Sequence, residues 1–254
     1  MEIFDSHAHY DAAAFQEDMD AVLSAMPKAG VVGIINAADS VQSAARSVIL
    51  ADTYPFVYAA AGVHPEHAGD VDVQTLADKL TPFLSHPKVV AVGEIGLDYH
   101  YDDAAPRAVQ KAVFEAQLQL ALAHNLPVIV HDRDAHADTW ELLRTYRPRG
   151  VVHCFSGSVE MMQDIVGIGM YIGLGGVASF PNAKRVRAVA KAVPADRLLL
   201  ETDAPYMAPV PHRGKRCDSR MIADTAAAIA ALRGVDRDTL LTQTAQNVRT
   251  LFGI

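Results

Sequence analysis

Seven side chains of the kinds that bind divalent cations are spread along this 254-residue chain. They are His7, His9, His64, Glu94, His131, His153 and Asp203. Imidazole nitrogens and carboxylate oxygens are common ligands of Zn²⁺ and other first-row divalent ions. One residue separates His7 from His9, and residues i and i+2 point to the same side of an extended backbone. We therefore interpret this pair as two ligands that can face one ion.

Glu94 closes an apolar run that begins at Val89. A carboxylate in that position would be buried, and burying a charge without a partner costs free energy. A cation shared with the histidines would supply the partner. In the alternative interpretation, Glu94 and the histidines make separate hydrogen bonds to the backbone or to each other.

Asp203 is the candidate for a second chemical role. A bound dication lowers the pKa of its water toward neutrality, and a nearby Asp can accept the proton that this water releases. The alternative is a turn-forming role in Asp203-Ala204-Pro205, a common use of Asp before proline. Because the histidine set is present, we predict that Asp203 and Glu94 are catalytic residues.

These side chains lie at or near the ends of short apolar segments with the composition of β-strands. The predicted strands are Glu2–Asp5, Val31–Asn36, Phe56–His64, Val89–Ile95, Pro127–His131, Val151–Phe155, Met170–Leu174 and Leu198–Asp203. Helical spacing is found in Phe15–Ala29, Val41–Thr53, Val73–Ser85, Pro106–His124, Ala137–Tyr146, Val159–Gly167, Asn182–Val193, Ser219–Leu232 and Arg237–Leu251. Strands that alternate with helices predict parallel βα units.

Eight such units predict an α/β protein with one (β/α)₈ TIM barrel over residues 1–254, since this fold takes about 250 residues. An open, doubly wound sheet is the competing fold. The first strand is not followed by the glycine-rich phosphate loop typical of that fold. Catalytic residues of barrels lie at the C-terminal ends of the strands. We therefore expect the seven side chains to meet at one mouth.

Charge and composition limit the possible partners and locations. The net charge of −8 gives no general basic surface for wrapping nucleic acid, because phosphate neutralisation by Lys and Arg supplies most non-specific affinity. A polyanion would have to be held by bound ions and a local basic cluster, which favours a strand end or a small phosphoester. The sequence has no apolar stretch of about 20 residues and no signal-peptide start. Its two cysteines, Cys154 and Cys217, are too few for a disulfide scaffold. We predict a soluble cytoplasmic protein without membrane attachment, and favour a monomer.

Six motifs, in order along the whole chain, closely resemble those of the TatD-type metal-dependent deoxyribonucleases in the amidohydrolase superfamily. They are Asp5–Asp11 (DSHAHYD), Gly62–Pro65 (GVHP), Gly93–Tyr99 (GEIGLDY), His131–Arg133 (HDR), His153–Gly157 (HCFSG) and Glu201–Tyr206 (ETDAPY). The resemblance implies a TIM barrel that hydrolyses phosphodiester bonds in DNA with divalent metal, often from a 3′ end.

The resemblance also implies roles for individual residues. One ion would be held by His7, His9, Glu94 and Asp203. The other would be held by Glu94, His131 and His153, with Glu94 bridging the two. His64 would contact the substrate phosphate, and Asp203 would be the base for the attacking water.

Basic residues near the expected mouth could bind further phosphates. They are Arg133 and, in the segment His212–Arg216, Arg213 and Lys215. The segment could be an ordinary solvated loop, but its place just after the last strand favours substrate binding. Family members often continue it with Asn-Glu-Pro, whereas Cys217-Asp218-Ser219 follows here. This departure is expected to alter the substrate rim more than the metal centre.

Four other residues near the mouth have two interpretations each. Tyr99, Tyr101 and Tyr206 could stack on exposed bases or serve in packing. Cys154 follows His153 directly and could suggest a thiol ligand. Since successive strand residues face opposite ways, we expect its side chain to point into the helix layer.

We predict a metal-dependent deoxyribonuclease that acts on DNA ends or single strands with one or two divalent ions. The ions could be Zn²⁺, Mg²⁺ or Mn²⁺. Two alternatives remain open. One is a hydrolase of the same superfamily that acts on a small phosphoester, amide or lactone, and the other is a metal-stabilised binding scaffold without catalysis.

Overall fold

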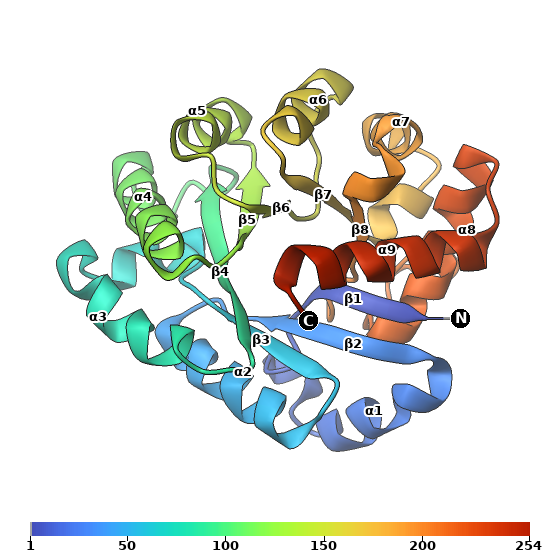
Figure 1. The fold of residues 1–254 in the computed structure, drawn as a ribbon, viewed down its shortest axis with the longest axis horizontal. Helices are drawn as coiled ribbons and strands as arrows, with labels where there is room; N and C mark the ends of the chain where they lie inside the picture. The colour runs from blue at the N-terminus through green and yellow to red at the C-terminus, as the bar shows by residue number, and fades with distance from the viewer. Residues whose placement is uncertain (1) are drawn as a thin grey trace.

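Eight parallel strands follow one another around a ring in the computed structural model, which describes residues 2–254 (Figure 1). They are β1 (Ile3–Ala8), β2 (Val31–Ala37), β3 (Val57–Ala61), β4 (Val89–Asp98), β5 (Val128–Arg133), β6 (Gly150–Val152), β7 (Tyr171–Leu174) and β8 (Leu198–Leu200). Each strand pairs with the next in the chain, and every pair is parallel. The predicted barrel is confirmed, and the open doubly wound sheet is excluded.

Helices surround the ring on its outside (Figure 1). The α-helices are α1 (Met19–Ala25), α2 (Val41–Thr53), α3 (Val73–Leu84), α4 (Arg107–His124), α5 (His136–Tyr146), α6 (Val159–Gly167), α7 (Lys184–Ala192), α8 (Ile222–Arg233) and α9 (Arg237–Phe252). Short 3₁₀ helices are η1 (Ala13–Phe15), η2 (Pro27–Ala29), η3 (Pro65–Asp70), η4 (Gly176–Ser179), η5 (Ala195–Arg197) and η6 (Ser219–Met221). Within residues 2–254, no helix has both the length and the apolar character needed to cross a bilayer.

The local sequence explains where several helices begin and end. Ser40 and Ser158 each accept a hydrogen bond from a first-turn backbone amide of α2 and α6, which satisfies an otherwise unpaired N–H. The predicted bounds of these two helices are confirmed. The single helix predicted from Phe15 to Ala29 is wrong, because the segment divides into η1, α1 and η2. Pro27 begins η2, and its ring has no N–H with which to continue α1.

One end of the barrel is closed by the C-terminal helix α9, which crosses the ring in Figure 1. Its buried residues Val248 and Leu251 belong to the same apolar cluster as the inward-facing Phe4 and Leu199. Asn247 of α9 donates hydrogen bonds to the carbonyls of Ala195 and Leu198, just before and at the start of β8, at 2.8 Å each. Helix α9 therefore seals the N-terminal end of the strands, and the opposite end is left for a site.

The ring closes between β8 and β1 with few hydrogen bonds. A single bridge joins Ala8 to Ala204, and the amide of Asp203 donates to the carbonyl of His7 at 3.0 Å. Deeper in the barrel, the fully buried carboxylate of Asp5 accepts from the amide of Thr202 at 3.0 Å and from its hydroxyl at 2.6 Å. These contacts form the seam of the barrel, and two of the predicted metal ligands take part through their own backbones.

We expect Thr202→Val to destabilise the protein by about 1–3 kcal/mol, because it removes one of the hydrogen bonds that the buried Asp5 carboxylate accepts and leaves the amide of Ala204 without a partner. The matched control is Thr53→Val on the exposed end of α2, which should change the free energy of unfolding by less than about 0.5 kcal/mol. Urea unfolding of both variants measures the difference. Equal values for the two would contradict the role of the seam.

Candidate metal centre

The first ligand group joins side chains from β1, from the residue after it, from β4 and from the loop after β8. His7 Nε2 lies 2.9 Å from His9 Nε2 and 3.2 Å from Glu94 Oε2. Asp203 Oδ1 lies 3.5 Å from His7 Nε2 and 3.4 Å from His9 Nε2. Four donor atoms from distant parts of the sequence therefore surround one point.

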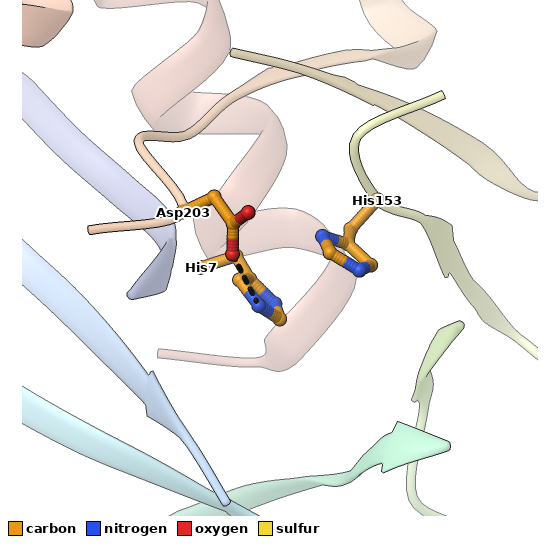
Figure 2. A group of neighbouring side chains, drawn as sticks. All are labelled: His7, His153 and Asp203. Carbon is orange, nitrogen blue, oxygen red and sulfur yellow. Dashed lines mark ion pairs between the residues drawn. The ribbon is translucent and has the colours of Figure 1, made fainter. Parts of the chain in front are cut away.

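A second ligand group surrounds the other oxygen of the same carboxylate. Glu94 Oε1 lies 2.7 Å from His153 Nε2, 2.9 Å from His131 Nδ1 and 3.5 Å from His64 Nε2. The rings of His7 and His153 are stacked with their centroids 3.9 Å apart. Figure 2 shows these two rings beside Asp203, with the ion pair from His7 to Asp203 dashed. The structure thus brings all seven predicted side chains together, with Glu94 between the two groups.

Strand β4 can deliver Glu94 to this point because of a glycine. Gly96 has a φ of 146°, a backbone conformation that L side chains rarely adopt. A Cβ atom at this position would overlap the carbonyl oxygen of His131 on β5. A larger residue would therefore separate β4 from β5, and with them Glu94 from His131.

Two of the imidazoles are held from behind by hydrogen bonds. His9 Nδ1 lies 2.8 Å from the carbonyl oxygen of Ala37. His131 Nε2 lies 2.9 Å from Asp98 Oδ2, so its Nδ1 faces Glu94. Asp98 was not among the predicted site residues. Its position four residues after Glu94, hence on the same side of an extended strand, was the signal that could have found it.

Burial and charge compensation govern the protonation of this cluster. Only 3% of Glu94 is exposed, which alone would raise its pKa. The imidazoles around it, chiefly His153 and His7, instead hold the pKa of Glu94 well below its usual range. Burial works against a charge on His131 too, but its bonds to Asp98 and Glu94 raise its pKa to about 10. Without a metal ion, protons on imidazoles therefore balance the buried carboxylates.

Other imidazoles stay neutral for the opposite reason. Burial and the neighbouring His153 lower the pKa of His7 to about 4. Burial lowers the pKa of His64 to about 3, although the charge of Glu94 opposes the shift. Both rings therefore keep a lone pair at neutral pH.

The donor set fits divalent ions in number, type and spacing. Ligands of a tetrahedral Zn²⁺ site lie about 3.3 Å apart, given bonds of about 2.0 Å. The groups His7–His9–Glu94 and His64–Glu94–His131 each have mutually close donor atoms, as do His7, His153 and Asp203. The side chain of Asp203 is 17% exposed, so the centre has access to solvent. A dication would replace the positive charge that the imidazoles otherwise carry as protons.

Two of the three predicted phosphate-binding cations pack on aromatic rings. The guanidinium of Arg133 lies 5.0 Å from the ring centroid of Tyr101 and donates to its hydroxyl at 3.1 Å. Arg213 lies over Phe180 at 4.5 Å, and Lys215 is exposed. None of these three cations forms an ion pair with a carboxylate of residues 2–254. No carboxylate of the described residues therefore lies within ion-pairing distance of these charges.

The segment that departs from the family pattern belongs to the seam instead of the rim. Cys217 and Ser219 are fully buried. The hydroxyl of Ser219 donates to Asp5 Oδ2 at 2.6 Å and lies 2.7 Å from the hydroxyl of Tyr10. Asp218 pairs with Arg220 at 2.7 Å. The side chains of Cys217 and Ser219 thus lie inside the protein, and the expected effect on the substrate rim stays a prediction.

The four residues that had two interpretations each differ in their surroundings. Tyr99 donates to Asp138 at 2.7 Å and packs on a guanidinium, which indicates a structural role. Tyr101 and Tyr206 are 45% and 59% exposed. Cys154 lies beyond the end of β6 with a φ of 42°, so strand alternation does not set its direction. Burial first, and then the charges of nearby carboxylates, raise the pKa of its thiol well above the usual range.

The chain is similar to known proteins over nearly its whole length. The family described as TatD related DNase matches residues 4–253. The uncharacterized metal-dependent hydrolase YabD of Bacillus subtilis is 37% identical over 255 residues, which cover 99% of each chain. The 3′-5′ ssDNA/RNA exonuclease TatD of Klebsiella pneumoniae is 35% identical over 260 residues, covering 99% of this chain and 98% of the relative. The crystal structure of the TatD homologue YJJV from Escherichia coli K12 superposes with a TM-score of 0.93 at 35% identity, covering 99% and 98%.

We expect metal binding to release protons, because an ion must displace the proton that His131 holds below a pKa of about 10. The apparent affinity for Zn²⁺ should therefore rise with pH between 6 and 9, by up to about tenfold per unit for each displaced proton. Calorimetric titration of the metal-free protein in two buffers with different ionisation enthalpies counts the protons. The same observed enthalpy in both buffers would rule out this coupling.

Proposed function

This chain belongs to the TatD-related DNase family, and we propose that it cleaves phosphodiester bonds of DNA at single strands or free ends. The observation that carries the proposal is the sharing of one buried carboxylate, Glu94, by two groups of ligand atoms. Relatives at 35% identity over nearly the whole chain are named as 3′-5′ exonucleases of single-stranded DNA and RNA. A 3′-to-5′ direction is part of the proposal.

We include two divalent ions in the proposed enzyme, one in each ligand group. His7, His9 and Asp203 would hold the first with Glu94 Oε2, and His131 and His153 the second with Glu94 Oε1. Four imidazoles favour Zn²⁺ or Mn²⁺ in affinity, whereas phosphoryl chemistry often uses Mg²⁺. Such ions, when bound, acidify water and neutralise the charge of the phosphate oxygens.

His64 supports this assignment as a donor to the substrate. Its Nδ1 accepts a hydrogen bond from the backbone amide of Glu66 at 3.2 Å. A neutral imidazole has one proton, so that proton lies on Nε2, the nitrogen that faces Glu94. Nε2–H can then donate to an oxygen of the phosphate. The side chain is better suited to this role than to that of a third imidazole ligand, which would need a lone pair on Nε2.

Asp203 has the properties of a general base. Burial works against its charge, but the hydrogen bond from His9 and the imidazoles of His7 and His153 lower its pKa below the usual value. The carboxylate is thus ionised at neutral pH. Oδ1 faces His7 and His9, and no described residue donates a hydrogen bond to Oδ2. Oδ2 can therefore accept the proton of the attacking water.

The rim of the site is suited to a strand end. Arg133 and Arg213 would bind flanking phosphates with guanidinium donors. The exposed rings of Tyr101 and Tyr206 could stack on unpaired bases. The net charge of −8 provides little attraction for a long duplex. We propose a monomer that acts in the cytoplasm, consistent with two free thiols at Cys154 and Cys217.

We expect Asp203→Asn to lower kcat on 3′-labelled single-stranded DNA by several powers of ten, because the base and a ligand charge are both lost. The exposed control Glu160→Gln on α6 should retain full activity. Bis(p-nitrophenyl) phosphate and a dihydropyrimidine amide are assayed in parallel. Hydrolysis of the amide without any loss of DNA would overturn the nuclease proposal, and unchanged function in Asp203→Asn would favour a binding scaffold.

Arg133→Ala should raise KM for single-stranded DNA by about tenfold or more, since a charge-assisted hydrogen bond contributes about 1.5–3 kcal/mol. The turnover of bis(p-nitrophenyl) phosphate should change little, because this substrate has no flanking phosphate. Arg144→Ala, an exposed arginine on α5, is the matched control. An equal loss on both substrates would place Arg133 at the scissile phosphate or in the fold.

A further inference from the structure

Glu201 is a buried carboxylate that has no part in the proposed reaction. It lies two residues before Asp203 and is 1% exposed. One of its oxygens, Oε1, accepts a hydrogen bond from the backbone amide of Cys154. The other, Oε2, is buried without any hydrogen-bond partner among residues 2–254. Because buried polar atoms are nearly always paired, this carboxylate requires an explanation.

The nearby His153 also has a buried polar atom without a hydrogen-bond partner in the described part of the chain. Its Nε2 is 2.7 Å from Glu94 Oε1, in the second ligand group. Its Nδ1 is buried and has no hydrogen-bond partner among the described residues. The nearest carboxylate oxygen to Nδ1 is Glu201 Oε1, at 3.8 Å. A ring whose Nε2 lone pair faces an ion must have its proton on Nδ1, and that proton faces the side of Glu201.

The neighbouring strand leaves room for this carboxylate. A Cβ atom at Gly173 of β7 would overlap Glu201 Oε2 and would lie 3.0 Å from the Cα atom of His153. A Cβ atom at Gly175 would lie 3.6 Å from Glu201 Cγ. Any larger residue at 173 would therefore push the carboxylate away from the imidazole. The glycine and the glutamate form one packing unit behind His153.

The other ligand imidazoles differ in the hydrogen-bond acceptor that lies behind each ring. His131 is held by the carboxylate of Asp98 at 2.9 Å, and His9 by a backbone carbonyl at 2.8 Å. His7 Nδ1 has no hydrogen-bond partner among residues 2–254. Carboxylates thus lie behind His131 and His153, the two imidazoles proposed to bind the second ion, and behind neither imidazole of the first group.

We propose that Glu201 is the positioning residue of His153, equivalent to Asp98 for His131, and that it tunes the affinity of the second ion. A carboxylate that accepts from Nδ1–H fixes the tautomer, orients the ring and makes Nε2 a stronger ligand. Two carboxylates, Glu94 and Asp203, would hold the first ion, whereas Glu94 alone would contribute a carboxylate to the second. Glu201 and Asp98 lie one layer further out, behind the two imidazoles that would bind the second ion. This inference rests on the two-ion arrangement of the proposed function.

The test is a Zn²⁺ titration of the metal-stripped full-length protein against a competing chelator. We expect Glu201→Leu to weaken one of the two ions by up to about 100-fold and Glu201→Gln by about tenfold, with the other ion unchanged. Glu201→Gln keeps the size of the side chain, so it remains informative if the leucine variant does not fold. Glu160→Gln is the control and should bind both ions like the unaltered protein.

Two further measurements separate positioning from simple packing. In the Zn²⁺-loaded protein, ¹⁵N–¹H correlation spectra should place the His153 proton on Nδ1, with a changed Nδ1–H shift in Glu201→Gln. Urea unfolding of the metal-free proteins gives their stability. Lower stability with both Zn²⁺ affinities within twofold of the unaltered protein would overturn the proposal. A single Zn²⁺ in the unaltered protein would overturn it as well.

The two proposals fail in different ways. If the unaltered protein binds two ions but leaves DNA intact, the nuclease assignment fails and the role of Glu201 stands on the titration. If the unaltered protein cleaves DNA and Glu201→Gln keeps both affinities, the assignment stands and the role of Glu201 fails.

Discussion

The structure depends on the compensation of one buried charge. Glu94 is 3% exposed at the polar end of a barrel filled with apolar side chains. A carboxylate in that position must be balanced by positive charge, because water cannot solvate it. Five imidazoles lie within 3.5 Å of its two oxygens. Whether the positive charge comes from protons or from ions, the side chains around Glu94 must lie close to its two oxygens.

The same compensation links the metal centre to the stability of the barrel. The backbones of His7 and Asp203 join β1 to the loop after β8, while their side chains face one point. A bound ion that held the side chains of His7 and Asp203 close together would therefore also hold β1 against the loop after β8. A ligand that binds the folded state alone stabilises it by mass action. Catalytic and architectural roles are therefore shared by the same few residues, and substitutions at the seam affect both.

Much of the arrangement was predictable because strand period and strand order are local properties. Parallel βα units place strand ends at one face, so His7, Glu94 and His131 had to meet there. The residues that orient the ligands were not predictable in the same way. Asp98 could have been found by its spacing from Glu94, but Glu201 becomes meaningful only once Gly173 of the neighbouring strand is in place. The rim cation Arg213 lies on the loop after β8, and the course of such a loop depends on packing that no period encodes.

The position of the seam has a consequence for how the enzyme matures during synthesis. His7 leaves the ribosome long before Asp203 and the Asp5 partner Ser219. Until Asp203 has been synthesised, a nascent chain lacks a ligand of the first group, and α9 has not yet closed the N-terminal end of the barrel. The proposed general base is thus among the last functional groups to arrive. A growing polypeptide would remain catalytically silent until the two ends of its barrel have met.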